Sequence, residues 1–285
     1  MVITEPRVGT ARTTLLLAAV LVAFAANSLI TRHVVGDGLL DAALLSAVRF
    51  IAGAVALVGI ALARRERPVV GRANLLPALW LGCYAACISI GYLYIGAAAG
   101  TFVFYAAVLL TLLAHEIVTR AAVPPRRMLG AAVALAGVAL LAWDALGTVT
   151  ALGVLLLAAT GIAWGLYTAA GRTVADPRVA TTGHFVVVAV AALPVAGVTA
   201  ATGVAVSVPG LVWGVAMGAG TTALAYVAWY AAQRSVSATM AGTVQLAIPV
   251  LTAVGAVLLL GEPLSPILVV AAALVCCGMA WGASR

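Results

Sequence analysis

The sequence predicts an all-α integral membrane protein with ten transmembrane helices, arranged as two inverted five-helix repeats. Three observations support this prediction: an extremely apolar composition, a series of apolar runs of similar length, and internal similarity at half the chain length. Of the 285 residues, 65% are hydrophobic and only 8% are charged, whereas soluble domains carry about 25% charged residues. So few polar side chains cannot cover a water-exposed surface, so lipid must surround most of the molecule.

The apolar runs divide into ten segments of the length that a membrane requires. A helix needs about 20 mostly apolar residues to cross the hydrocarbon core. Arginine clusters at 64–72 and 120–127 separate some runs, and turn-forming residues at 96–100 and 207–210 separate others. One helix over 73–119 would be about 70 Å long, so this stretch must turn back. The predicted spans are residues 13–34, 42–63, 76–96, 99–119, 128–145, 150–171, 180–201, 209–232, 239–260 and 264–283.

The distribution of arginines predicts the orientation of these spans. Positive residues remain preferentially in cytoplasmic loops. With the N-terminus inside, only Arg32 falls in an external loop and Arg49 falls within the second span, while all other arginines are cytoplasmic. The composition, rich in Ala, Gly, Val, Leu and Arg, is typical of GC-rich bacterial genomes. We therefore expect a multi-pass protein of the bacterial inner membrane with both termini in the cytoplasm.

The second half of the chain resembles the first. A shift of 141 residues pairs Val103 with Val244, Pro125 with Pro266 and Gly137 with Gly278. The shift predicts two units, residues 1–145 and 146–285. Because five spans is an odd number, the second unit would enter the membrane inverted, as in many secondary transporters. Two inverted halves can alternate between inward-open and outward-open shapes around a central site, so the pattern favours alternating access.

Several classes of partner and cofactor are not predicted. The net charge of +7 comes from scattered arginines that form no basic stripe, so we expect no nucleic-acid partner. Cys83, Cys87, Cys276 and Cys277 lie in apolar runs without histidine or acid at ligand spacing, so we expect no metal and no other cofactor. The expected partners are a small-molecule substrate and the lipid bilayer. The small-residue pattern of Gly278 and Gly282 also makes the last span a candidate homodimer surface.

Polar side chains at bilayer depth are expensive, and they are therefore candidates for substrate binding. Asn27 lies in the middle of the first span and Gln245 in the ninth. Each could instead form an interhelical hydrogen bond that only holds the bundle. Arg49 could anchor a substrate carboxylate, or it could pair with a carbonyl or with an acid such as Asp41.

Aromatic residues predict the chemistry of a central cavity. Tyr105, Trp164, Tyr167 and Tyr226 lie deep within their spans, whereas aromatic residues near span ends are typical of interfacial belts. Rings at this depth would suit an amphiphilic metabolite, because their faces can hold an apolar body or a cationic amine.

His115 and Glu116 are adjacent titratable residues inside an apolar run, so they are candidates for proton coupling. The alternative is an ordinary helix pair between Glu116 and Arg120. His184, at the start of the seventh span, is expected at the membrane interface. Pro249 removes a backbone donor and predicts a helix kink in the ninth span.

Two short motifs resemble EamA-type permeases of the drug/metabolite transporter superfamily. Pro249-Val250-Leu251-Thr252 is followed by Leu260-Gly261-Glu262-Pro263-Leu264, and Arg49-Phe50 also fits that family's pattern. The resemblance implies gradient-dependent transport, usually export, of metabolites such as amino acids through a cavity between the halves. In the first half, Val108 stands where the repeat would place the proline, and Arg120-Ala121 replace the Gly-Glu pair. We expect Glu262 near the external surface, where it would complement the dipole of the tenth span.

The sequence therefore predicts a permease that moves a small organic metabolite, amino acid or drug-like amphiphile by alternating access, in the direction of export. The alternative is an intramembrane enzyme that acts on a lipid or headgroup substrate. The chain contains no His-Glu-x-x-His, no paired intramembrane aspartates and no Gly-x-Ser-x-Gly, so we favour the permease and predict no catalytic residues.

Overall fold

The computed structural model describes residues 11–119, 125–144, 150–171, 174, 176–233, 245 and 247–283. Within these ranges the chain is helical, and its only β-type pairing is a single bridge between Leu40 and Val206. The helices are α1 (Ala11–Gly36), α2 (Ala42–Ala63), a short 3₁₀ turn η1 (Arg72–Asn74), α3 (Leu75–Gly91), α4 (Ala97–Val118), α5 (Pro125–Asp144), α6 (Ala151–Gly171), α7 (Pro177–Ala201), α8 (Val208–Ala216), the π-helix η2 (Met217–Leu224), α9 (Ala225–Gln233), α11 (Ala247–Leu260) and α12 (Pro266–Ala283).

Each predicted span overlaps a helix, and the eighth consists of α8, η2 and α9 in succession. In the part of the chain that is described, seven helices are long and apolar enough to cross a membrane. The fifth, ninth and tenth predicted spans contain shorter apolar helices there, Met128–Gly137, Ala247–Leu260 and Pro266–Gly278. The multi-pass, all-helical fold is thus confirmed, while the full count of ten crossings stays a prediction.

Short polar side chains define where several helices begin. The Asp41 carboxylate accepts hydrogen bonds from the backbone N–H groups of Ala43 and Leu44, at 2.8 and 3.1 Å, at the start of α2. Asp176 and Ser207 cap α7 and α8 in the same way. These caps satisfy N–H groups that have no partner inside the helix. They fix the turns between adjacent apolar segments.

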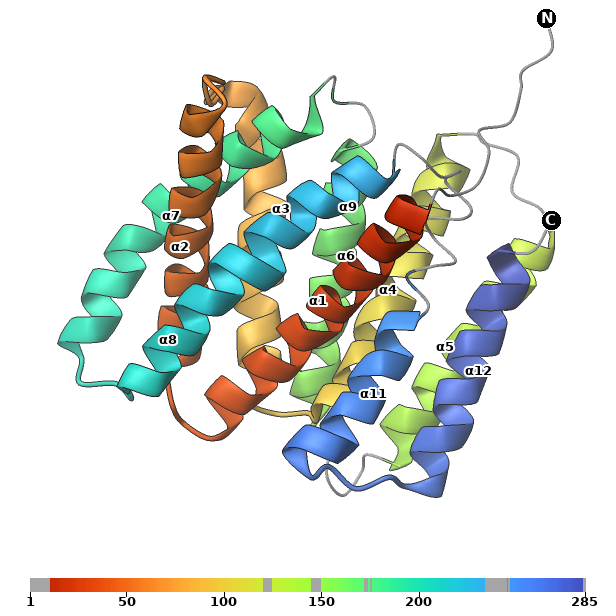
Figure 1. Cartoon of the computed structure of the whole chain (residues 1–285). Helices are drawn as coiled ribbons and strands as arrows, with labels where there is room; N and C mark the ends of the chain where they lie inside the picture. The colour runs from red at the N-terminus through yellow and green to blue at the C-terminus, as the bar shows by residue number, and fades with distance from the viewer. Residues whose placement is uncertain are drawn as a thin grey trace, which may run out of the picture.

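Pairs of helices form the two edges of the bundle. In Figure 1, α2 lies beside α7 at one edge and α5 beside α12 at the other, and both pairs are in extensive contact. Helices α1, α3, α4, α6 and α9 lie between these edges, with α6 packed on both α3 and α4. One large apolar core cluster includes residues of α1, α2, α3, α4, α6, α7, η2 and α9. The central helices therefore join both halves of the sequence in one apolar core.

The packing of α12 on α5 uses one of the small residues assigned to a dimer surface. A methyl group at Gly278 would lie 2.4 Å from the carbonyl oxygen of Gly130 in α5. Gly278 is therefore required for a contact within the chain, and its presence no longer argues for a homodimer through α12.

Glu262 caps a different helix from the one the sequence predicted. Its carboxylate accepts hydrogen bonds from the backbone N–H groups of Ala97 and Ala98, at 2.6 and 3.2 Å, at the start of α4. It also lies 3.7 Å from Nε of Arg32 in α1. The expected role at the start of α12 was wrong because Ser265 lies closer in sequence and caps that helix, accepting from the N–H of Leu268 at 3.0 Å.

The π-helix η2 lies against α2 at a point where the backbones nearly touch. A methyl group at Gly218 would lie 2.3 Å from the carbonyl oxygen of Arg49. π-Helical turns are rare and occur frequently at functional sites. The absence of a side chain at Gly218 lets η2 approach the buried arginine.

We expect Gly218→Ala to destabilise the protein, because the new methyl group forces η2 and α2 apart. Overpacking of this kind costs about 1–3 kcal/mol. The measurement is the free energy of unfolding, or the thermal midpoint, of the purified protein in detergent. Gly220→Ala is the matched control in the same π-helix, because no atom lies within 4 Å of its new methyl group. Equal stability of the two variants would contradict the proposed close contact.

Candidate functional site

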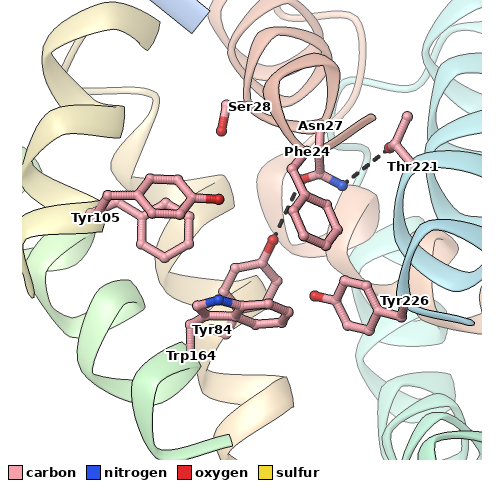
Figure 2. Close-up of a pocket in the computed structure, with 9 residues that line it drawn as sticks. Phe24, Asn27, Ser28, Tyr84, Tyr105, Trp164, Thr221 and Tyr226 are labelled. Atoms are coloured by element: carbon pink, nitrogen blue, oxygen red, sulfur yellow. Dashed lines mark hydrogen bonds between the residues drawn. The ribbon is translucent and has the colours of Figure 1, made fainter. Parts of the chain in front are cut away.

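A small pocket lies among the central helices (Figure 2). Its lining comes from α1, α3, α4, α6, η2 and α9 and consists of Phe24, Asn27, Ser28, Tyr84, Phe104, Tyr105, Trp164, Thr221 and Tyr226. The cavity that these residues enclose is about 10 Å³, which is roughly the space of one water molecule.

Aromatic rings form much of the wall. The centroids of Trp164 and Tyr226 are 4.9 Å apart, those of Trp164 and Tyr84 are 5.4 Å apart, and that of Phe24 lies 5.8 Å from Tyr226. Tilted and edge-to-face contacts at these distances are favourable for aromatic pairs. Phe104 and Tyr105 complete the wall from α4, with ring centroids 4.5 Å apart. The rings thus support one another in a rigid apolar cage.

Asn27 joins α1 to η2 at the polar side of the pocket. Its amide nitrogen donates to Thr222 Oγ1 at 2.9 Å and to Thr221 Oγ1 at 3.2 Å. Its amide oxygen accepts from the Tyr84 hydroxyl at 3.5 Å (Figure 2). The interhelical hydrogen bond that the sequence offered as an alternative is therefore present, and the same side chain also lines the pocket.

Arg49 lies behind this polar side and is completely buried. Its Nη2 donates to Thr31 Oγ1 at 2.8 Å and lies 3.5 Å from the sulfur of Met217, whereas Nε and Nη1 have no hydrogen-bond partner. Thr31 in turn donates to the backbone oxygen of Asn27 at 2.7 Å. The predicted alternative of a pair with Asp41 is not formed, since the Asp41 carboxylate caps α2. Among the side chains that the structure describes, the buried Arg49 thus has no carboxylate partner.

Two further candidates from the sequence lie next to the cage. Tyr167 does not line the pocket, but its ring centroid is 5.8 Å from that of Trp164. The Tyr167 hydroxyl lies 3.2 Å from Nδ1 of His184. His184 is only 5% exposed, and the Tyr167 hydroxyl supplies a polar partner for it. Its expected position at the membrane interface stays a prediction.

The remaining candidates lie outside the pocket lining. Gln245 and Pro249 are buried, but α11 is described only from Ala247, so the kink at Pro249 stays a prediction. His115 is exposed, about 16 Å along the axis of α4 from Phe104. The side chain of Glu116 lies outside the described part of the chain. Proton coupling through this pair therefore also stays a prediction.

Several site residues escaped the sequence argument. Phe24 and Phe104 looked like ordinary apolar residues of their spans, although Phe24 precedes Asn27 by three positions and so shares its helix face. Thr221, Thr222 and Thr31 are small and polar, and nothing in their local sequence separates them from structural threonines. The run Gly-Ala-Gly-Thr-Thr at 218–222 was the available signal, because two glycines before adjacent threonines weaken an α-helix.

We expect Thr31→Val to lower the free energy of unfolding by about 1–3 kcal/mol, because the variant leaves the buried Arg49 without an oxygen acceptor. Denaturant unfolding in micelles measures this change. Thr160→Val is the control: Thr160 is fully buried, but its hydroxyl bonds only to the Leu156 carbonyl of its own helix, at 2.8 Å. A loss of stability no larger than that of the control would argue against the network around Arg49.

Comparisons with known proteins agree with this architecture. The sequence model of the EamA-like transporter family matches residues 151–281. An uncharacterized protein of Pseudomonas aeruginosa is 34% identical over 256 residues, which cover 90% of this chain and 88% of that protein. A solved crystal structure with 22% sequence identity superposes with a TM-score of 0.69 and covers 96% of both chains, which shows a shared fold.

Proposed function

Because this chain belongs to the EamA-like transporter family, we propose that it is a permease that exports a small organic metabolite by alternating access. Family membership identifies a multi-pass membrane transporter of the drug/metabolite superfamily. The observation that carries the finer proposal is the central pocket, which is lined by an aromatic cage and by polar groups from Asn27 and Thr221. A pocket with an apolar wall and a few convergent polar groups is typical of small-molecule sites.

In this proposal the moving bodies are the two units 1–145 and 146–285. The pocket takes residues from both, since α1, α3 and α4 belong to the first unit and α6, η2 and α9 to the second. The contacts of α2 with α7 and of α5 with α12 join the second and fifth helices of the two units. Such pairing of equivalent helices supports an internal two-fold relation of the kind found in inverted repeats.

Ion pairs between the units at opposite ends of the bundle support alternating access. At one end, Glu262 joins the start of α4 and Arg32 of α1. At the other end, Glu66 after α2 lies 3.3 Å from Arg178 at the start of α7. Helix α2 separates these ends by about 33 Å. In a rocking carrier, breaking one contact while keeping the other would open the pocket to one side only.

The proposed setting is the bacterial inner membrane, with both chain ends in the cytoplasm. In Figure 1, α1 begins and α12 ends toward the same side of the bundle. The arginines Arg64, Arg65, Arg67 and Arg72 lie between α2 and α3 at that side, as expected for a cytoplasmic face. A homodimer remains a further proposal from the sequence.

The permease proposal predicts that cells overproducing the protein release at least one metabolite faster than cells with an empty vector. The measurement is quantitative metabolite analysis of cells and medium over time. We expect Trp164→Ala to reduce the excess release about tenfold, because it removes the ring that contacts both Tyr84 and Tyr226; losing about 1.4 kcal/mol of binding has this effect. Asn27→Ala should act in the same direction.

Trp281→Ala is the matched control, because this tryptophan is 53% exposed on α12 and does not line the pocket. Comparable amounts of each variant in the membrane must be verified by immunoblot. Unchanged levels of all metabolites in cells producing the wild-type protein would contradict the permease. Equal release by the Trp164 variant would contradict the assignment of the pocket as its substrate site.

The role of Glu262 can be tested through the backbone amides that it caps. We expect Glu262→Gln to accelerate hydrogen exchange at Ala97 and Ala98 about tenfold, since hydrogen bonds to a charged acceptor are worth about 1.5–3 kcal/mol. Mass spectrometry of a peptide that spans the start of α4 measures the rate. Asp37→Asn is the control at the same end, because Asp37 pairs with His33 of α1, at 2.7 Å. Equal exchange in both variants would mean that Glu262 does not hold the units together.

A further inference from the structure

Among the described residues, the charged side chain buried behind the pocket is a cation. Arg49 is fully buried, and the groups with which it interacts electrostatically are Tyr84, Tyr226 and Tyr92, with no carboxylate among them. The acidic side chains that the structure describes all lie at or beyond helix ends: Asp37, Asp41, Glu66, Asp176 and Glu262. A cation in a medium of low polarity acts over a longer distance than in water. The pocket therefore lies in an uncompensated positive field.

The pocket also contains a buried donor without an acceptor. Among the described atoms, Trp164 Nε1 has no hydrogen-bond partner, while the Tyr226 hydroxyl interacts with the Tyr84 hydroxyl. In Figure 2 the indole nitrogen of Trp164 points toward the middle of the surrounding side chains. An indole N–H can only donate, so a ligand that satisfies Trp164 must present an acceptor.

The positive charge of Arg49 and the unsatisfied donor of Trp164 both favour an anionic acceptor on the ligand. A carboxylate oxygen would accept a hydrogen bond from Trp164, and such charge-assisted bonds are about twice as strong as neutral ones. The negative charge would compensate Arg49, which contacts the pocket wall through Thr31 and Asn27. Arg49 would act on the ligand through its charge, since it does not line the pocket itself.

The rest of the lining disfavours a ligand that carries an ammonium group in addition to its carboxylate. None of its nine residues is acidic, so an ammonium group would find no counter-ion and would be repelled by Arg49. The rings of Phe24, Tyr84 and Trp164 instead provide apolar surface. We therefore propose that the pocket binds an apolar monocarboxylate, a small organic anion with an aromatic or aliphatic body and no ammonium group. This inference rests on the proposed permease function and specifies its substrate class.

Four compounds with one phenylpropyl skeleton test this proposal: 3-phenylpropionate, 3-phenylpropan-1-ol, 3-phenylpropan-1-amine and phenylalanine. Competition with radiolabelled 3-phenylpropionate on the purified protein in lipid nanodiscs at pH 7 gives relative affinities. We expect the anion to bind about tenfold more tightly than the alcohol and the zwitterion, and the amine to bind most weakly. Equal or tighter binding of the amine, the alcohol or phenylalanine would overturn the proposal, and so would the absence of binding by all four.

Two variants assign the preference to the charge of Arg49. Arg49→Met removes the charge and should abolish the advantage of the anion over the alcohol, whatever its effect on the absolute affinity for both compounds. Asn27→Asp places a carboxylate beside the same network, so it should reverse the order of anion and amine even if the Arg49 variant folds poorly. Arg64→Gln is the control, because Arg64 is exposed at the end of the same helix. An anion preference that survives in both pocket variants would contradict the assignment to Arg49.

The results distinguish failure of the proposed substrate class from failure of the permease proposal. Specific binding of the anion without its flux into proteoliposomes would support the substrate class and contradict transport. Failure of all four compounds to bind, together with release of other metabolites from cells, would leave the permease and refute the monocarboxylate.

Discussion

The burial of Arg49 is the constraint on which the centre of the molecule depends. A guanidinium group at bilayer depth is expensive, and its cost is reduced only if the surrounding backbone and side chains supply acceptors. Here the acceptor is Thr31 of α1, and the sulfur of Met217 in η2 lies beside it. The arginine thus requires that α1, α2 and η2 meet at one point, and Gly218 is what allows η2 to come close enough. The polar side of the pocket is formed by the same meeting of helices.

The irregular winding of η2 connects this constraint to the pocket. Thr221 and Thr222 are adjacent in sequence, yet both lie within hydrogen-bonding distance of the Asn27 amide. These hydrogen bonds hold the amide nitrogen of Asn27 toward η2, and its amide oxygen faces Tyr84. The ring of Tyr84 contacts that of Trp164, which in turn contacts Tyr226, and these contacts form the aromatic cage. The site is therefore held by hydrogen bonds on its polar side and by contacts between rings on its apolar side.

Much of the fold followed from the sequence, because membrane solvent imposes simple rules on length and hydropathy. The predicted second span, 42–63, coincides with α2, and the break at 96–100 separates α3 from α4. The sequence singled out Asn27, Tyr105, Trp164 and Tyr226 because polar and amphipathic side chains at depth need partners, and all four line the pocket. Their role in substrate binding stays a prediction. The sequence did not predict which distant residues these side chains contact. The sequence placed Glu262 with its own helix, because contacts between distant segments such as Glu262 with Ala97 leave no periodic signal. Likewise, the sequence did not identify the threonines around Arg49 as site residues, because nothing in their local sequence separates them from structural threonines.

The cap that Glu262 supplies also limits how the two units could ever be separated. Helix α4 begins with N–H groups whose acceptor is a side chain more than 160 residues away in sequence. A polypeptide that ended after α5 would leave those amides without their carboxylate in a region poor in water. The predicted repeat pairs Glu262 with Ala121 of the first half, and an alanine side chain has no oxygen with which to cap a helix. The first half of the chain therefore depends on the second for the carboxylate that caps α4.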